Sequence, residues 1–158
     1  MKHLPKHDRP RWRYLAVELE SWPDATLDRR AFQTALWRAA RGLLGDPGSA
    51  AADLRLVGFA FADGDGTATV RARRGEVDAA RAALACVDEA GGVPLGVQVL
   101  GASGTIRACE ERYVDEPAEP VERRVSFRDA TRRAVQRGDR LDVETNGGFT
   151  GATELDVE

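Results

Sequence analysis

Two segments with alternating polarity are separated only by the turn-forming sequence ADGDG, and this spacing constrains the fold more than any other feature. Every second side chain is apolar in residues 54–61 and again in residues 67–74. A connection this short, rich in Asp and Gly, joins two neighbouring antiparallel strands. The sequence therefore predicts a β-hairpin near the middle of the chain, and the other elements have to be arranged around it.

Segments with helical and strand-like patterns flank this hairpin on both sides. Residues 13–20 alternate like a half-buried strand, and apolar side chains recur at helical spacing over residues 27–44. A second helical pattern covers residues 75–92, and residues 93–101 read as a fourth strand. This order predicts an α+β two-layer sandwich of RRM-like (ferredoxin-like) βαββαβ topology, in which both helices cover one face of an antiparallel sheet.

A short helix is predicted to close the domain at residues 104–113. Its Ile106, Cys109 and Tyr113 recur at i, i+3 and i+7 and are expected to point inward. The second face of the sheet is then left for this helix, for solvent or for a partner. Cys109 and Cys86 are distant in the sequence, so two buried thiols are favoured over a disulfide.

Charge and composition divide the chain into a basic arm (1–14), a domain (15–114) and an acidic extension (115–158). The arm carries five cations against one acid, and the extension carries seven arginines against eleven acids. Residues 121–138 are compatible with a weakly amphipathic helix, and Asn146–Gly147 is a turn signal. No core of useful size is evident here, so we expect an extension that is mobile or ordered by a partner.

Several classes of protein are disfavoured by the sequence. The chain has no apolar run long enough to span a bilayer and no secretory signal pattern, so we expect a cytoplasmic protein with no membrane partner. Residues 15–114 contain no histidine, which excludes a Cys–His nucleophile pair within the domain. The overall charge of −3 does not by itself indicate a nucleic-acid partner.

The candidate metal ligands have simpler interpretations. The DGDG segment lacks the later acids of a calcium-binding loop, so a tight turn is favoured. His3 and His7 lie in a proline-bearing arm without further ligands, which makes a zinc site improbable. Glu18 and Glu20 are interpreted as a solvated strand face. No constellation resembles a complete protein active site, and no metal site is expected.

The arm has the residue types that bind RNA. Three arginines, Arg9, Arg11 and Arg13, interleave with Trp12 and Tyr14. Arginine matches phosphate groups, and aromatic rings offer platforms for bases or riboses. The pattern fits an arm that contacts RNA, and it fits equally a solvated arm whose Trp12 packs against the edge of the domain.

The third strand offers a second basic surface. Arg71, Arg73 and the adjoining Arg74 lie on its polar side or at its end, where they face either an RNA backbone or solvent. A conventional RRM stacks bases on aromatic side chains at these strand positions. Because Thr69 and arginines stand there instead, stacking of single-stranded bases on the sheet is not expected.

The two ends of the domain resemble a known family. MKHLPKHDRPRWRYLAVELE and GTIRACEERY resemble the protein component 2 family of archaeal ribonuclease P, over roughly Lys2 to Val114, and the acidic extension resembles appendages of haloarchaeal members. The resemblance implies a subunit of a ribonucleoprotein endonuclease that removes the 5′ leader of precursor tRNA by phosphodiester hydrolysis. It implies that ribonuclease P RNA carries the Mg²⁺-dependent chemistry, and that this chain binds no cofactor and supplies no catalytic residue.

The resemblance also implies a protein partner, the TIM-barrel-like protein component 3 of ribonuclease P, and only indirect contact with precursor tRNA. Under it, Ile106 and Cys109 are packing residues. The candidate RNA-binding residues, taken from the residue patterns and the resemblance together, are Lys2, Lys6, Arg9, Arg11, Trp12, Arg13, Arg71, Arg73, Arg74 and Arg107.

Two rival functions fit the same predicted topology. One is a regulatory βαββαβ module that binds a small molecule between the sheets of a homodimer, although the basic arm has no purpose in it. The other is an acylphosphatase-like hydrolase, which needs a phosphate-cradling arginine loop after the first strand. The segment ESWPDAT at that place supplies no arginine.

Overall fold

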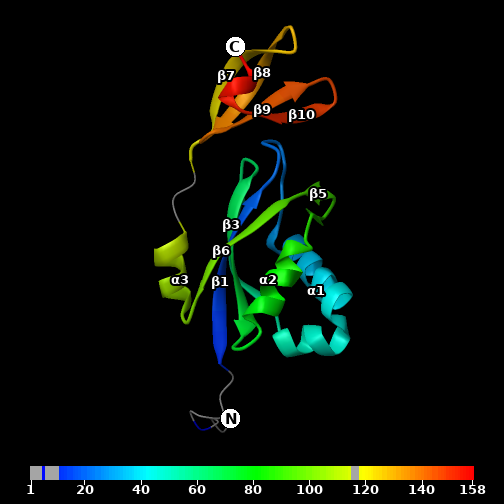
Figure 1. The fold of residues 1–158 in the computed structure, drawn as a ribbon, viewed down its shortest axis with the longest axis vertical. Helices are drawn as coiled ribbons and strands as arrows, with labels where there is room; N and C mark the ends of the chain where they lie inside the picture. Colours follow the sequence, from blue (N-terminus) through cyan, green and yellow to red (C-terminus); the bar gives the residue numbers. More distant parts are fainter. Residues whose placement is uncertain (1–4, 6–10, 115–117) are drawn as a thin grey trace.

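The computed structural model describes Pro5, residues 11–114 and residues 118–158. A unit of three helices and an antiparallel sheet is followed along the chain by a small all-β unit (Figure 1). The elements of the first unit are β1 (Trp12–Glu20), α1 (Arg29–Ala52), β2 (Arg55–Ala62), β3 (Asp65–Arg73), α2 (Val77–Ala85), β4 (Glu89–Ala90), β5 (Val93–Pro94), β6 (Gly96–Ser103) and α3 (Ile106–Tyr113).

The main sheet of the first unit has the strand order β2-β3-β1-β6, and each neighbouring pair is antiparallel. The predicted hairpin is confirmed: Ala62 pairs with Asp65 across a turn of Asp63 and Gly64, both with positive φ. Gly64 tolerates no side chain, because a Cβ there would lie 2.2 Å from the Trp22 carbonyl oxygen. The hairpin turn is therefore packed directly against the chain that leaves β1.

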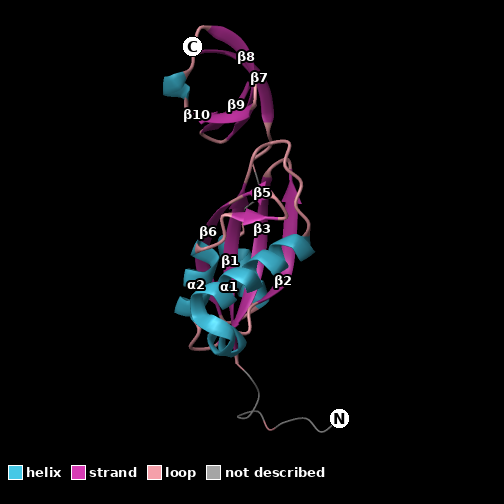
Figure 2. Cartoon of the chain, turned by 90° about the vertical axis from the view of Figure 1, so that its right-hand side faces the viewer, coloured by secondary structure: helices cyan, strands magenta, loops and turns pink. Residues whose placement is uncertain are grey.

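The main core lies between the sheet and the two longer helices, which cover the same face of the sheet in Figure 2. Leu15, Val17 and Leu19 supply the β1 part of this core, as the alternation predicted. Phe32 and Leu36 of α1 are fully buried against it. Burying such side chains stabilises the fold by roughly 1.5–3 kcal/mol each.

The first helix differs from its prediction at both ends. It begins at Arg29 instead of Leu27, where Asp28 caps it, and the Asp28 Oδ1 accepts from the Ala31 amide at 2.7 Å. The prediction ends the helix at Leu44, and Gly45 (φ 72°, ψ 172°) does interrupt it there, but helical structure resumes after Gly45 and continues to Ala52. Pro47 is tolerated because proline fits the first turn of a helix. Leu43, an apolar residue near the end of the predicted helix, is 48% exposed.

The second helix is shorter than predicted. It ends at Ala85, and β4 and β5 then form a small hairpin of their own. Gly91 and Gly92 make its turn with positive φ values of 58° and 79°, so these glycines form a turn between strands rather than ending a helix. The two strands are additional to the predicted order of elements.

The short helix α3 lies on the opposite face of the sheet from α1 and α2 (Figure 1). Thr105 caps it by accepting from the Ala108 amide at 3.1 Å. Cys109 is fully buried, and the Tyr113 ring lies so close to Gly101 that a Cβ there would be 2.2 Å from Tyr113 Cζ. The prediction for Ile106 is wrong, because this side chain is 38% exposed.

The extension contains strands where a helix was predicted. Its elements are β7 (Val121–Phe127), β8 (Ala130–Arg137), β9 (Arg140–Thr145), β10 (Gly148–Ala152) and the 3₁₀ turn η2 (Glu154–Asp156). The strands form one antiparallel sheet in the order β10-β9-β8-β7, and the Asn146–Gly147 turn joins β9 to β10 as expected. The sheet has a small core of its own, made by Val125, Phe127, Ala134, Leu141, Val143 and Ala152.

The prediction of a helix over residues 121–138 is wrong, because the apolar spacing fits a helix and the hairpin turn lacks the Asn-Gly or Asp-Gly pair that would have indicated two strands. Arg128 and Asp129 form that turn, and both take positive φ values, 50° and 61°. The chain end adds to the sheet, since the backbones of Ser126 and Glu158 exchange two hydrogen bonds of 3.0 Å. No helix in the described part of the chain is long and apolar enough to cross a membrane.

Candidate nucleic-acid interface

Arginines from neighbouring strands gather around Trp12 at the end of the sheet where β1 begins. Register places Trp12 opposite Arg73, and Tyr14 opposite Arg71. Arg55 of β2 stands opposite Arg71 on the other side. Directly paired residues of antiparallel strands project from the same face, so these five side chains, the arginine patch, share the face that carries α3.

Trp12 holds two of these arginines. The guanidinium carbon of Arg71 lies 3.8 Å from the centroid of the Trp12 ring, and that of Arg73 lies 5.1 Å from it. Such cation–π contacts are worth roughly 0.5–2 kcal/mol each. One face of the ring is thereby covered, so Trp12 serves to position arginines and belongs to a strand rather than to the predicted arm.

The patch carries more positive charge than its surroundings neutralise. Arg73 lies 3.5 Å from a carboxylate oxygen of Asp53, but no carboxylate among the described residues pairs with Arg55 or Arg71. The Arg71 Nε is buried and has no hydrogen-bond partner within the same part of the chain. Like charges directly opposite one another destabilise a sheet, and a bound polyanion relieves that repulsion.

The other predicted binding residues are distributed around this patch. Arg11 and Arg74 are exposed beside it, and the Arg74 amide donates to the Arg11 carbonyl at 2.9 Å. Arg13 lies opposite Ala72, on the other face of the sheet, and its Nη1 extends toward Gly104. Lys2, Lys6 and Arg9 lie outside the described residues.

Arg107 is separate from the patch. It lies on the exposed side of α3, where its Nε donates to Glu111 at 2.8 Å one helical turn away. Arg55, in contrast, was missed by sequence reasoning although it completes the patch. Its place beside Arg71 depends on the register of the hairpin, which is altered by a bulge near Val57, and only a strand pairing reveals it.

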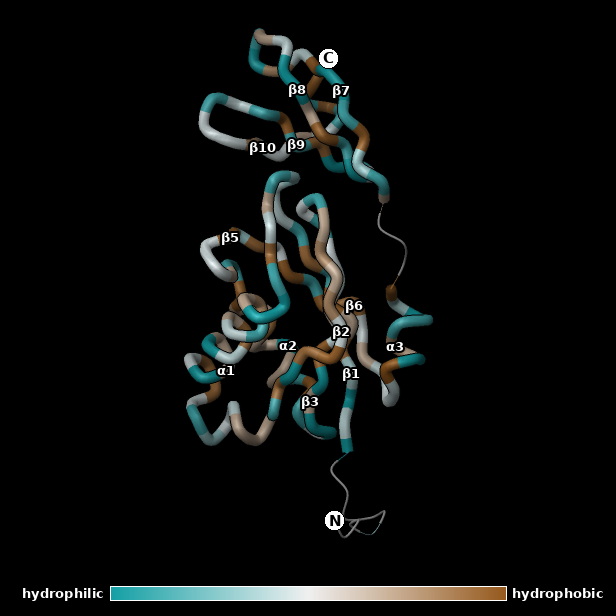
Figure 3. Tube along the Cα trace, turned by 180° about the vertical axis from the view of Figure 1, so that it is seen from behind, coloured by the Kyte–Doolittle hydropathy of each residue, from teal (hydrophilic) through white to brown (hydrophobic). Residues whose placement is uncertain are grey.

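Hydrophilic residues dominate the ends of β1 and β3 near the N-terminus (Figure 3). The same sheet face changes along its length. Beyond the patch it is covered by α3, and farther on it carries Glu18 and Glu20 of β1 together with Asp65 of β3. Burial raises the pKa of Glu18, and the neighbouring carboxylates of Asp65 and Glu20 raise it further.

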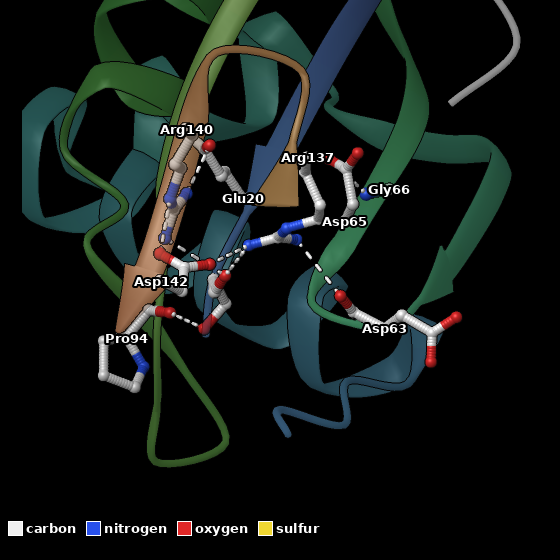
Figure 4. Close-up of polar contacts among 9 residues, drawn as sticks. Glu20, Asp63, Asp65, Gly66, Pro94, Arg137, Arg140 and Asp142 are labelled. Carbon is white, nitrogen blue, oxygen red and sulfur yellow. Dashed lines mark hydrogen bonds and ion pairs between the residues drawn. The ribbon is translucent and has the colours of Figure 1, made fainter. Parts of the chain in front are cut away.

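The second cluster of charged residues joins the extension to the first unit (Figure 4). Arg137 of β8 is buried, and its guanidinium donates to the carbonyls of Ser21 (2.7 Å) and Asp63 (3.1 Å) and to the Asp142 carboxylate (2.8 Å). Arg140 donates to Asp142 at 2.8 Å and pairs with Glu20 of β1. These contacts hold the extension against the β2–β3 turn and the end of β1.

No chemistry of a protein active site emerges from these clusters. The described residues contain no group of three or more His, Cys, Asp or Glu side chains placed to hold a metal ion. The pKa of the Cys109 thiol is raised by burial and by Glu110, which disfavours a reactive thiolate. What the geometry offers instead is a fixed set of cations on a rigid sheet, suited to a phosphate backbone.

Comparison with known proteins matches this architecture to a family. The sequence profile of the Rpp14/Pop5 family matches residues 13–114, from the second residue of β1 to the residue that follows α3. The chain belongs to the Rpp14/Pop5 family. The match includes Arg55, Arg71 and Arg73, begins one residue after Trp12, and stops where the extension begins.

Curated members of the Rpp14/Pop5 family include close relatives of this chain. It is 63% identical over 158 residues to ribonuclease P protein component 2 of Natronomonas pharaonis, covering 99% of this chain and 98% of the relative. The protein of the same name from Haloarcula marismortui is 54% identical over 159 residues and is covered to 99%.

A more distant member of the family is shorter. Ribonuclease P protein component 2 of Archaeoglobus fulgidus is 35% identical over 115 residues, which make up 73% of this chain and 99% of the relative. Together with the boundary of the family match at Val114, this indicates that the second sheet is an addition to the family fold that the haloarchaeal relatives share.

Proposed function

We propose that this chain is a protein subunit of ribonuclease P that takes part in tRNA processing. Membership of the Rpp14/Pop5 family supports this, as do relatives named ribonuclease P protein component 2 that match nearly its whole length. In this function the chain belongs to an endoribonuclease holoenzyme that removes the 5′ leader of precursor tRNA, while the RNA performs the hydrolysis. Mg²⁺ then belongs to the catalytic RNA and not to this chain.

The observation that carries the proposal is the arginine patch on a family-wide sheet. A protein that supports a folded RNA needs cations at fixed points along the phosphate backbone and needs no readout of bases. Trp12 holds Arg71 and Arg73 in place, and Arg55 stands beside them. Phosphodiester groups of ribonuclease P RNA are the ligand that we assign to this patch.

We also infer that residues 12–103 form an RRM-like βαββαβ module into which β4 and β5 are inserted. The order β2-β3-β1-β6, with the first and third strands central, supports this inference. Base stacking of the conventional RRM kind is not part of the proposal, because Thr69 and Arg71 occupy the central strand. The protein partner is proposed to be the TIM-barrel-like protein component 3 of the same enzyme.

Reconstitution tests the proposal. Ribonuclease P RNA and the remaining protein subunits of a haloarchaeon are assembled with and without this chain, and cleavage of precursor tRNA is measured at low Mg²⁺. We expect the complete mixture to cleave at the 5′ leader faster than the mixture lacking the chain. Equal rates would reject the proposal, and so would a metabolite-dependent activity of the isolated chain, as the regulatory alternative requires.

A further inference from the structure

A cavity of about 860 Å³ opens where the sheet, α3 and the extension meet. Its floor is the end of the sheet remote from the arginine patch, with Glu18, Glu20 and Asp65. Tyr113 of α3 lines one side, and Arg137 of β8 lines another. The cavity is therefore composite, since it needs both the family fold and the added sheet.

The charge of the cavity is opposite to that of the patch. Five of its described lining residues are acidic: Glu18, Glu20, Asp63, Asp65 and Glu119. Among the same described residues, Arg137 is the one cationic side chain. Arg137 and Glu20 are already engaged, with Asp142 and Arg140 respectively. The raised pKa of Glu18 reports the repulsion and desolvation that remain. A polyanion is repelled here, whereas a cation relieves the repulsion.

Arg137 forms the buried wall of the cavity next to the extension. Its side chain is only 5% exposed, and Nη1 and Nη2 are both hydrogen-bonded, yet its Nε is buried without an acceptor in the described part of the chain. A buried donor without a partner costs roughly 1–3 kcal/mol. This Nε is inaccessible, so Arg137 fixes the wall of the cavity and offers no donor to a ligand.

Apolar side chains complete the lining. Phe61, Leu100, Tyr113 and Pro120 provide surface next to the acids. The aliphatic stem of a lysine or arginine packs on such surface while its charged head reaches the carboxylates. Free metal ions gain nothing from these apolar walls, and the described residues hold no cluster suited to binding one.

We propose that this cavity binds a lysine- or arginine-bearing peptide segment of a partner protein. The cationic side chain lies between Glu18 and Asp65, and its stem packs on the apolar walls. One sheet face thus serves two partners, with RNA at its basic end and protein at its acidic end. This site goes beyond the family fold, because the relative from Archaeoglobus has no counterpart of the extension.

The test uses the full chain and a fluorescent octapeptide that alternates glycine and arginine, with anisotropy as the readout. The Glu18→Gln/Asp65→Asn double variant removes two carboxylates from the floor and is expected to weaken binding about tenfold. The matched control, Glu89→Gln/Asp129→Asn, removes two carboxylates that do not line the cavity and should bind like wild type. The corresponding glycine–glutamate octapeptide should not bind.

Chemical shifts of the wild-type chain keep the proposal falsifiable if the double variant misfolds. On titration with the arginine peptide, the amide signals of Glu18, Asp65 and Tyr113 are expected to shift together. Shifts confined to other surfaces, equal binding by the two double variants, absence of binding to wild type, or equal binding of the glutamate peptide would each overturn the proposal. Because the isolated chain is used, a failure here is distinct from a failure of ribonuclease P reconstitution.

Discussion

The guanidinium carbon of Arg71 lies 3.8 Å from the centre of the Trp12 ring, at the end of the sheet where the chain enters β1. This contact joins Trp12, the first residue of β1, to Arg71 of the neighbouring strand β3. It assigns Trp12 a positioning role and makes the arginine patch a preformed surface. The first two predictions concern this surface.

Trp12→Leu is expected to weaken binding of ribonuclease P RNA several-fold, because Arg71 and Arg73 lose the ring that orients them. The dependence of affinity on salt distinguishes positioning from base stacking. If Trp12 orients arginines, the slope of log affinity against log salt also becomes shallower in the variant. An unchanged slope with weakened binding would instead indicate that the ring stacks on a base.

Arg71→Gln and Arg55→Gln are each expected to reduce that salt slope by about one, since each removes one phosphate contact. Filter binding over a series of KCl concentrations measures the slope. Arg81→Gln, an exposed arginine on α2, serves as the matched control. The assignment of the patch fails if the control and the two patch variants have the same slope.

The packing of α3 gives a prediction on stability. A Cβ at Gly101 would lie 2.2 Å from Tyr113 Cζ, so Gly101→Ala displaces the ring and loosens α3 from the sheet. The free energy of unfolding should fall by about 1–3 kcal/mol, measured by urea denaturation. The Gly101→Ala/Tyr113→Ala double variant should lose less free energy of unfolding than the sum of the losses in the two single variants. A loss equal to that sum would contradict the contact.

Docking of the extension depends on Arg137. Arg137→Met removes the bonds to the Ser21 and Asp63 carbonyls and leaves the fully buried Asp142 with Arg140 alone. Breaking a buried pair in this way costs roughly 3–5 kcal/mol. Trp22, which stacks on Phe149 of the extension at 6.3 Å, should change its fluorescence as the extension separates.

Replacing both members of that pair, Arg137→Met with Asp142→Leu, should recover part of the loss, because the fully buried carboxylate is removed together with its buried partner. The buried bonds to backbone carbonyls are screened only weakly by salt, so the effect of Arg137→Met should persist in concentrated KCl. An effect that vanishes at high salt would contradict the buried character of the contact.

Glu18 predicts a dependence of stability on pH. Its pKa is raised in the folded chain, chiefly by burial and then by Asp65 and Glu20, while Glu119 and Arg137 also face the cavity. The folded chain then binds more protons than the unfolded chain, so Glu18 lowers stability as pH rises through its folded pKa. The free energy of unfolding of Glu18→Gln, taken relative to wild type, should therefore be higher at pH 7 than at pH 4. Solvent screening keeps this change below about 1 kcal/mol. A loss of stability at neutral pH would contradict this sign.

The sequence predicted the elements whose patterns are local. The β2–β3 hairpin, the buried side of β1 and the turn at Asn146–Gly147 were all evident from alternation and turn residues. Arg55 was not identified, because its position beside Arg71 depends on the pairing between strands and on a bulge in β2. The sequence allowed two interpretations of Trp12, contact with RNA or packing against the domain edge, and its position opposite Arg73 depends on strand pairing that no local pattern predicts.

The extension was mispredicted for a physical reason. Residues 121–138 carry apolar side chains spaced so that either a helix or a hairpin is possible, and the deciding turn uses Arg128 and Asp129 at positive φ. Its buried cluster is assembled from four strands, and no single strand supplies more than two of its members. The junction through Arg137 likewise joins residues 116 positions apart, which no local pattern reveals.

The central claim is that this chain lends arginines to a catalytic RNA. The most direct test measures single-turnover cleavage of precursor tRNA by reconstituted ribonuclease P containing either wild-type chain or the Arg55→Gln/Arg71→Gln/Arg73→Gln variant, over a range of Mg²⁺ concentrations. The variant should need more Mg²⁺ for the same rate and should approach wild type when Mg²⁺ is abundant, whereas Arg30→Gln/Arg38→Gln/Arg81→Gln on the helical face should behave like wild type. Identical Mg²⁺ dependence for the patch variant and wild type would contradict the claim.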